Sequence, residues 1–283
     1  MRLLAHAKLN LSLAVGSPRD DGYHDVDTLV QTIGLADGVT VTRRRSGLEV
    51  RNSVPIPQDE DLCLRAAAAL LRAKHEARGA RIEVDKRIPL GAGLGGGSSD
   101  AAATLWAIDR LYPPSLPEET LLALAGELGV DVPLFFTGGR LRAVGRGDRV
   151  VERLPTPDEW YVVLVPPFPC STEAVYAAHR ARRKEAPEER APSGFGRNDL
   201  LAAAVSVFPE LSRYVHAVRA PAARYGGLTG SGSACYAAVA DEETAQGMAA
   251  ALRKRFPEAE VMHTVAVPCG IERLESENAC TSR

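Results

Sequence analysis

The residues of this 283-residue chain that most clearly suggest chemistry are the glycines of a short segment between a strand pattern and a helix pattern. Five of the seven residues 91–97 are glycine. No helix or strand interior tolerates that density, because each glycine costs about 0.5–1 kcal/mol relative to alanine. Glycine lets successive backbone amides, and the N-terminus of the following helix, approach an anion closely. Phosphate is therefore the expected ligand, and a flexible linker is the alternative.

Two common phosphate-loop patterns match this segment only in part. Gly91, Gly93 and Gly96 satisfy G-x-G-x-x-G. Pro89, however, interrupts the approach to the loop, and no acidic residue closes a following strand as in dinucleotide-binding folds. The spacing of G-x-x-x-x-G-K-[ST] is also present, but position 97 is glycine where that motif needs lysine. The residues predict phosphate binding without fitting either motif fully.

The same segment resembles the phosphate-binding motif of the small-molecule kinase superfamily that includes galactokinases, homoserine kinases, mevalonate kinases and phosphomevalonate kinases. It reads PLGAGLGGGSS over residues 89–99 and continues with DAA. Three further segments agree with one branch of that superfamily in order and spacing: AKLNLSL (7–13) with DGYHDVDTL (21–29), LGVDVPLFF (128–136) and LTGSGSACY (228–236). The matches span nearly the whole chain, and the form GLGGGSSDAA is similar to the branch whose acceptor carries a cytidine diphosphate.

The resemblance implies an ATP-dependent kinase acting on the 2-hydroxyl of a cytidine diphosphate-linked methylerythritol, in the non-mevalonate route to isoprenoid precursors. Mg²⁺ is expected with ATP, and its ligands stay open. A sibling kinase for mevalonate-type acids or homoserine, and a nucleotide-binding sensor without catalysis, are the alternatives. The implied ATP-binding residues are Pro89, Leu90, Gly91, Ala92, Gly93, Leu94, Gly95, Gly96, Gly97, Ser98 and Ser99.

Phosphoryl transfer needs a cation and a group that receives the hydroxyl proton, besides the phosphate loop. The resemblance implies that Lys8 is the cation, although an exposed strand lysine is the alternative from composition alone. Asp131 would be the base, and a helix N-cap is its alternative role. Asn10 shares the face of Lys8 by the period of two and is expected either to order the substrate or to face solvent. Ser98 or Ser99 would offer a hydroxyl to Mg²⁺ or phosphate, cap the helix, or both.

Two aromatic positions are expected to hold the nucleobase. Tyr23 and His24 follow a turn glycine, where turn geometry does not need a large ring. The resemblance implies that cytosine stacks on Tyr23, is read at its edge by His24 and is covered by Tyr176. A core contact on a helix is the alternative for Tyr176, because the residues before it depart from the Pro-Thr-Pro-like turn of the family.

A second glycine turn precedes a strand pattern at 234–240. Its residues Gly230, Ser231 and Gly232 are expected to bring backbone close to the substrate phosphates, and a simple hairpin turn is the alternative.

Periodicity predicts the elements that must position these residues. Alternation indicates strands over 9–15, 29–35, 39–42 and 80–87, and apolar runs indicate strands over 160–165, 234–240 and 261–267. Helices are predicted over 61–79, 101–111, 118–128, 198–207, 209–219 and 242–256, with Ser98-Ser99-Asp100 as the cap of the second, and a polar loop over 180–193. Because strands and helices do not alternate regularly, the pattern favours an α+β fold with mixed sheets. Prolines between residues 155 and 169 favour an ATP-binding domain over 1–154 and a second domain over 155–283, with the active site between them.

Composition excludes several classes of protein. With 45% hydrophobic and 25% charged residues, the chain is neither disordered nor fibrous. The 34 basic and 36 acidic residues give a net charge of −2, without a basic block, so nucleic acid is not an expected partner. Five scattered cysteines and the lack of a long apolar run favour a soluble protein in the reducing cytoplasm, with no membrane partner. The oligomeric state stays open.

Overall fold

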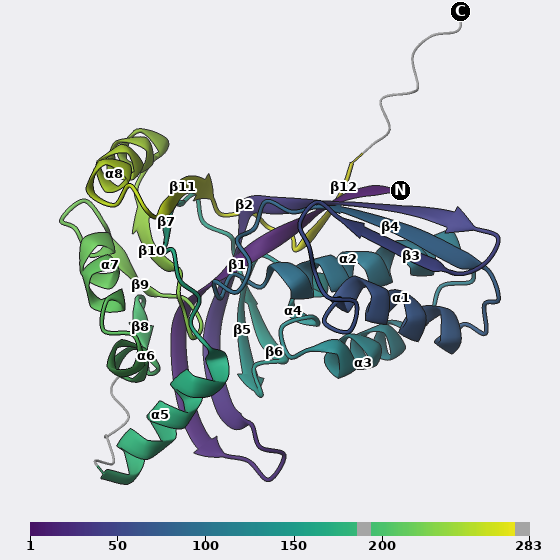
Figure 1. Cartoon of the computed structure of the whole chain (residues 1–283), viewed down its shortest axis with the longest axis horizontal. Helices are drawn as coiled ribbons and strands as arrows, with labels where there is room; N and C mark the ends of the chain where they lie inside the picture. The colour runs from purple at the N-terminus through teal and green to yellow at the C-terminus, as the bar shows by residue number, and fades with distance from the viewer. Residues whose placement is uncertain (186–193, 275–283) are drawn as a thin grey trace, which may run out of the picture.

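The computed structural model describes residues 1–185 and 194–274, which form helices and mixed sheets (Figure 1). The strands are β1 (Arg2–Pro18), β2 (His24–Arg44), β3 (Leu48–Asn52), β4 (Gly79–Asp85), β5 (Arg140–Gly145), β6 (Arg149–Leu154), β7 (Trp160–Val165), β8 (Arg197–Asn198), β9 (Tyr225–Leu228), β10 (Cys235–Val239), β11 (Glu260–Val265) and β12 (Ile271–Leu274). The helices are α1 (Leu62–Ala73), α2 (Gly96–Leu111), α3 (Glu118–Leu128), α4 (Leu134–Thr137), α5 (Thr172–Glu185), α6 (Leu201–Val207), α7 (Leu211–Val218) and α8 (Glu242–Arg255). Within the described ranges, no helix is both long and apolar enough to cross a membrane.

The first sheet is built around the long hairpin of β1 and β2. Its central order is β12-β1-β2-β4-β3, with β5 pairing β2, β6 pairing β5, and β8 pairing β1. Helices α1, α2 and α3 lie together against one end of this sheet (Figure 1). Their core joins residues such as Leu3, Val39 and Ile82 of the strands to the alanines of α1 and α2. Small alanine side chains let these helices approach the strands closely.

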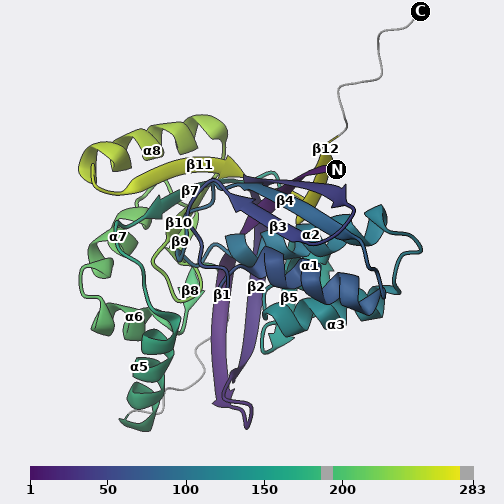
Figure 2. The same cartoon turned by 45° about the vertical axis from the view of Figure 1, so that its right-hand side comes forward.

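The second sheet is antiparallel, in the order β11-β7-β10-β9, and α6, α7 and α8 lie on the side away from the hairpin (Figure 2). Alternate residues of β7 enter different cores: Val162 packs with the helices, whereas Tyr161 packs with Leu9 and Leu11 of β1. Because both faces are buried, the strand is a continuous apolar run. The second sheet therefore packs against β1, the strand that carries Lys8.

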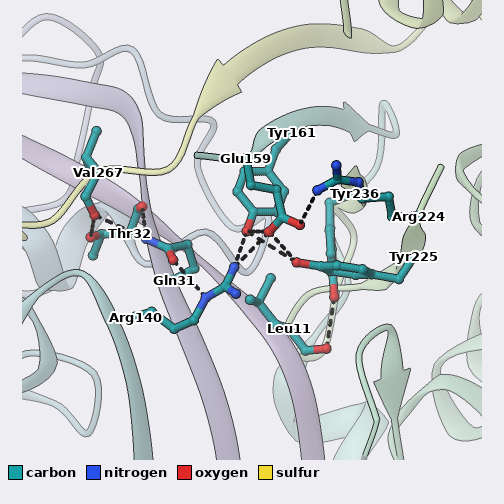
Figure 3. A network of polar contacts seen from close by, with 10 residues as sticks. All are labelled: Leu11, Gln31, Thr32, Arg140, Glu159, Tyr161, Arg224, Tyr225, Tyr236 and Val267. Carbon is teal, nitrogen blue, oxygen red and sulfur yellow. Dashed lines mark hydrogen bonds and ion pairs between the residues drawn. The ribbon is translucent and has the colours of Figure 1, made fainter. Parts of the chain in front are cut away.

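A buried polar cluster joins the two sheets (Figure 3). Arg140 of β5 donates to Glu159 Oε2 at 2.7 Å and to the Tyr161 hydroxyl at 2.9 Å. The hydroxyls of Tyr161 and Tyr225 also donate to Glu159. Burial opposes ionisation of Glu159, but the hydrogen bonds from Tyr161, Tyr225 and Arg140 outweigh it and lower the Glu159 pKa. The charged cluster fixes how the second sheet sits on the first.

Several predicted elements need correction. The first three predicted strands are parts of two longer ones, and the loop predicted from residue 180 is helical as far as Glu185, while 186–193 lie outside the described residues. The end of this helix is bonded to β1, because Arg183 Nη1 donates to the carbonyl oxygens of Val15 and Gly16, both at 2.8 Å. The helix predicted at 118–128 and the strand predicted at 160–165 have those bounds.

Candidate active site

Lys8 and Asp131 meet although 122 residues separate them in the chain. Lys8 Nζ lies 3.4 Å from Asp131 Oδ2, with the lysine side chain 5% exposed and the aspartate side chain 30% exposed. The alternative role of Asp131 as an N-cap is wrong, because Pro133 occupies that position of α4 and no side chain caps the helix. The pair thus combines a buried cation with a carboxylate that solvent or a ligand can reach.

Asn10 holds the lysine in place. Its Oδ1 accepts from Lys8 Nζ at 2.6 Å, and its Nδ2 donates to Thr28 Oγ1 at 2.9 Å. Its backbone amide donates to Thr229 Oγ1, also at 2.9 Å. Lys8 and Asn10 are both buried, so the solvent-facing alternative is wrong for each of them. The amide orders the lysine and ties β1 to the segment after β9.

The glycine loop packs directly on this pair. Leu94 O accepts from the backbone amide of Lys8 at 2.9 Å. Gly93 and Gly95 adopt φ values of +79° and +73°, which glycine enters without strain. A Cβ on Gly93 would lie 2.7 Å from Thr229 O, and one on Gly95 would lie 3.0 Å from Lys8 Cγ. The glycines are therefore needed for the loop to fit against Lys8 and the 229–232 turn.

The helix after the loop starts earlier than predicted. Gly96 opens α2, with Gly95 as its N-cap, so the predicted cap at Ser98-Ser99-Asp100 is wrong and these residues lie inside the helix. Ser99 N already makes the first intrahelical bond, to Gly95 O at 2.9 Å. The amides before it belong to the helix N-terminus, which attracts anions. Ser99 is fully buried, whereas Ser98 is partly exposed.

A buried cluster of charged residues joins α2 to β2, and it was not predicted from the sequence. Lys86 Nζ donates to Asp100 Oδ2 at 2.6 Å and also pairs with Asp37. Asp37 in turn accepts from the backbone amide of Ile88 at 2.8 Å. Burial raises the pKa of Asp100 to about 7 against the opposing charge of Lys86. Since the Lys86 side chain is 2% exposed, it anchors the loop to the sheet and does not reach a ligand.

The second glycine turn lies beside the glycine loop. Ala234 N donates to Ala92 O at 3.0 Å, and Ser231 Oγ lies 2.8 Å from Thr172 Oγ1. Gly230 and Gly232 have φ values of +57° and +94°. Asn198, which was not predicted, donates from Nδ2 to Gly230 O at 2.7 Å. Its only signal in sequence was a polar residue before an apolar helix.

An open pocket of about 580 Å³ gathers the three predicted nucleobase residues. The rings of His24 and Tyr176 lie 5.3 Å apart between centroids. Tyr23 is 48% exposed, and Arg146 stands 5.3 Å from its ring centroid. The pocket is also lined by residues that were not predicted: Gly22, Val26, Val130, Arg146, Thr172, Glu173 and Arg180.

The surroundings of His24 favour its neutral ring. Burial lowers its pKa, and the positive charge of Arg180 lowers it further. Tyr176 comes from α5, and burial, with Asp131 nearby, raises its pKa to about 12. Val130 lines the pocket next to Asp131, so the pocket continues toward the Lys8–Asp131 pair.

The fold, with a glycine loop that opens a helix, a lysine–carboxylate pair and a pocket beside them, is that of a small-molecule kinase of the GHMP class. Residues 61–139 match the family model for the GHMP kinases N terminal domain, and 183–258 match that for GHMP kinases C terminal.

Similarity to curated proteins shows which family of GHMP kinases the chain belongs to. The chain is 36% identical over 282 residues to the 4-diphosphocytidyl-2-C-methyl-D-erythritol kinase of Moorella thermoacetica, covering 94% of this chain and 99% of that protein. It is 40% identical to the enzyme of the same name from Thiobacillus denitrificans, covering 88% and 90%. The chain belongs to the family of 4-diphosphocytidyl-2-C-methyl-D-erythritol kinases.

Solved structures agree. A crystal structure of 4-(cytidine 5'-diphospho)-2C-methyl-D-erythritol kinase matches with a TM-score of 0.80 and 36% identity, over 94% of this chain and 99% of that one. Homoserine kinase from Cytophaga hutchinsonii, at 16% identity, 96% coverage of both chains and a TM-score of 0.68, shares the fold. The predicted kinase family and α+β fold class are confirmed.

Proposed function

We propose that this protein transfers the γ-phosphoryl group of ATP to the 2-hydroxyl of 4-diphosphocytidyl-2-C-methyl-D-erythritol, in isoprenoid precursor biosynthesis. The observation that carries the proposal is the Lys8–Asp131 pair, 3.4 Å apart, between the N-terminus of α2 and the pocket of Tyr23, His24 and Tyr176. The similarity to curated kinases of that substrate supports it.

The chain's own groups account for the transfer. The amides of the 91–97 loop and of the α2 N-terminus bind the ATP phosphates. Asp131 accepts the proton of the acceptor hydroxyl. The hydroxyl oxygen forms the bond to the γ-phosphorus while the bond between that phosphorus and the leaving ADP oxygen breaks. Lys8 supplies positive charge beside the developing phosphoryl charge, and Asn10 keeps its ammonium group in position.

The acceptor is recognised in the open pocket. Cytosine stacks on Tyr23, with Tyr176 on the other side and the neutral His24 ring at its edge. The Gly230, Ser231 and Gly232 turn approaches the phosphates of the acceptor. Arg146 and Arg180, which line the same pocket, add positive charge for a diphosphate.

Magnesium fits the oxygen donors beside the loop. A Cβ on Gly129 would lie 3.9 Å from Ser98 Oγ, which places this hydroxyl against the segment that carries Asp131. Ser98 would hold the ion together with phosphate oxygens, whereas the fully buried Ser99 would not. When bound with ATP, Mg²⁺ neutralises charge on the phosphates.

A coupled assay of ADP release tests the proposal, with the cytidylated methylerythritol, mevalonate and homoserine run in parallel. We expect turnover with the cytidylated acceptor only. Equal turnover of mevalonate or homoserine would establish a sibling kinase, and ATP binding without turnover of any acceptor would establish a sensor. A cytoplasmic location is part of the proposal, and the free thiols of Cys63, Cys170, Cys235 and Cys269 agree with it.

A further inference from the structure

Three side chains with different ligand atoms gather where β12 pairs with the start of β1. His6, Cys269 and Glu272 place one nitrogen, one sulfur and one carboxylate oxygen within 4.8 Å of one another. His6 belongs to β1, Glu272 to β12, and Cys269 to the segment that leads into β12. Backbone pairing brings them together, because His6 N donates to Gly270 O at 3.0 Å.

The buried imidazole of His6 is oriented for a ligand. His6 is 3% exposed, and its Nδ1 lies 3.1 Å from Ile33 O, so Nδ1 carries the proton in the neutral ring. Nε2 has no hydrogen-bond partner and lies 3.4 Å from Glu272 Oε2. Burial lowers the pKa of His6 and so favours the neutral ring. A lone pair on Nε2 then faces a carboxylate, an arrangement that a cation between them would stabilise.

We propose that His6 Nε2, the Cys269 thiolate and the Glu272 carboxylate bind one divalent transition-metal ion of the Zn²⁺ type. Nitrogen, sulfur and oxygen ligands together suit Zn²⁺ and do not suit Mg²⁺, which takes oxygen ligands. Ligand atoms around one zinc ion lie about 3.3–3.8 Å apart, given bonds of 2.0–2.3 Å. His6 Nε2 and Glu272 Oε2, which are 3.4 Å apart, already meet this separation, so Cys269 is the ligand that moves closer on binding. Water fills the fourth position.

Binding exchanges one proton for the metal bond. Burial raises the pKa of the Cys269 thiol, so the metal-free protein holds a proton on sulfur. That proton leaves to the buffer as the metal–sulfur bond forms, whereas the neutral His6 ring binds through its Nε2 lone pair and releases none. The metal would tie β12 to β1, two residues before Lys8, and would stabilise the fold by an amount that grows with the logarithm of the free metal concentration above Kd.

The test uses the full-length protein after removal of metals with a chelator. We expect one Co²⁺ per chain with a thiolate-to-metal absorption band, and one Zn²⁺ per chain in competition with a chromophoric chelator. Calorimetry of Zn²⁺ binding in two buffers of different ionisation enthalpy should report release of about one proton. The variants His6→Gln, Cys269→Ser and Glu272→Gln each lose one metal ligand and should bind the metal at least about tenfold more weakly. Tenfold is the smallest loss of affinity that is typical when even a partner outside the ligand set is removed, so loss of a ligand should cost at least as much.

Matched variants separate this site from other ligands. His216→Gln removes an exposed imidazole, and Cys280→Ser removes a thiol outside the described residues; both should keep the wild-type affinity and band. Glu272→Gln keeps the result interpretable if His6→Gln fails to fold, because Glu272 is exposed. Failure of the wild type to bind, a Co²⁺ complex without the thiolate band, or unchanged affinity in Cys269→Ser and Glu272→Gln would overturn the proposal.

Discussion

Replacing Asp131 by asparagine removes one negative charge from the Lys8–Asp131 pair and keeps the shape of the side chain. At 3.4 Å, the attraction between Lys8 and Asp131 is about 5 kcal/mol for an effective dielectric constant of about 20. The net loss of stability is smaller than this, because solvent reaches the Asp131 side chain and screens the pair, and because an asparagine oxygen still presents a partial negative charge to Lys8. The variant should therefore fold, while the acceptor hydroxyl loses the group that takes its proton.

The expected loss is in turnover. Removing a general base costs about 10²–10⁴-fold, or about 2.7–5.5 kcal/mol of barrier. We expect kcat to fall by that factor, with the Kd for an ATP analogue within about threefold of wild type, because the proposed phosphate site in the 91–97 loop and at the N-terminus of α2 is unchanged. Steady-state ADP release and calorimetric titration measure the two quantities.

The control is Glu127→Gln, which removes one exposed carboxylate from α3 and should leave both quantities unchanged. If Asp131→Asn kept more than about a tenth of wild-type kcat, Asp131 would not be the base. A parallel loss of ATP affinity would instead assign it to the nucleotide site.

Three further changes test other parts of the site and fold. Tyr23→Ala should raise KM for the cytidylated acceptor about 5–150-fold, the equivalent of a stacking contact of 1–3 kcal/mol, and leave KM for ATP unchanged; equal effects on both would argue against stacking. Gly93→Ala should raise the Kd for an ATP analogue at least about tenfold, since its Cβ would meet Thr229 O at 2.7 Å; a folded variant with normal affinity would show that the loop does not need glycine there. Glu159→Gln should lower the free energy of unfolding at pH 7 by about 3–5 kcal/mol, because Arg140 loses its buried carboxylate. Because the pKa of Glu159 is lowered in the fold, the stabilisation that its ionised form gives the fold is complete above the ordinary carboxyl pKa and disappears as the pH falls through the folded pKa. Urea unfolding between pH 7 and pH 3 should therefore show a free energy of unfolding that depends less on pH in the variant than in the wild type. An equal pH dependence in both proteins would contradict this role.

Local patterns predicted much of the secondary structure. The helix at 118–128 and the strand at 160–165 were predictable because each has strong apolar content and clear boundaries. The start of α2 was not, since Gly96 and Gly97 have low helix propensity and enter the helix only because the loop packs on β1. The helical end at 180–185 was also missed, because its polar sequence is stabilised by distant contacts such as that of Arg183 with β1.

By itself, the sequence determined the class of chemistry. The glycines of 91–97 indicated phosphate binding. The segments that hold Lys8, Asp131 and the Tyr23–His24 pair resemble those of a kinase family, and that resemblance implied phosphoryl transfer to a nucleotide-linked acceptor. Only the tertiary structure decided which of them meet. The 3.4 Å contact of Lys8 with Asp131, the meeting of His24 with Tyr176, and the His6–Cys269–Glu272 cluster all join residues more than 100 positions apart. Such contacts depend on how two sheets pack, and local periodicity carries no information about distances between elements.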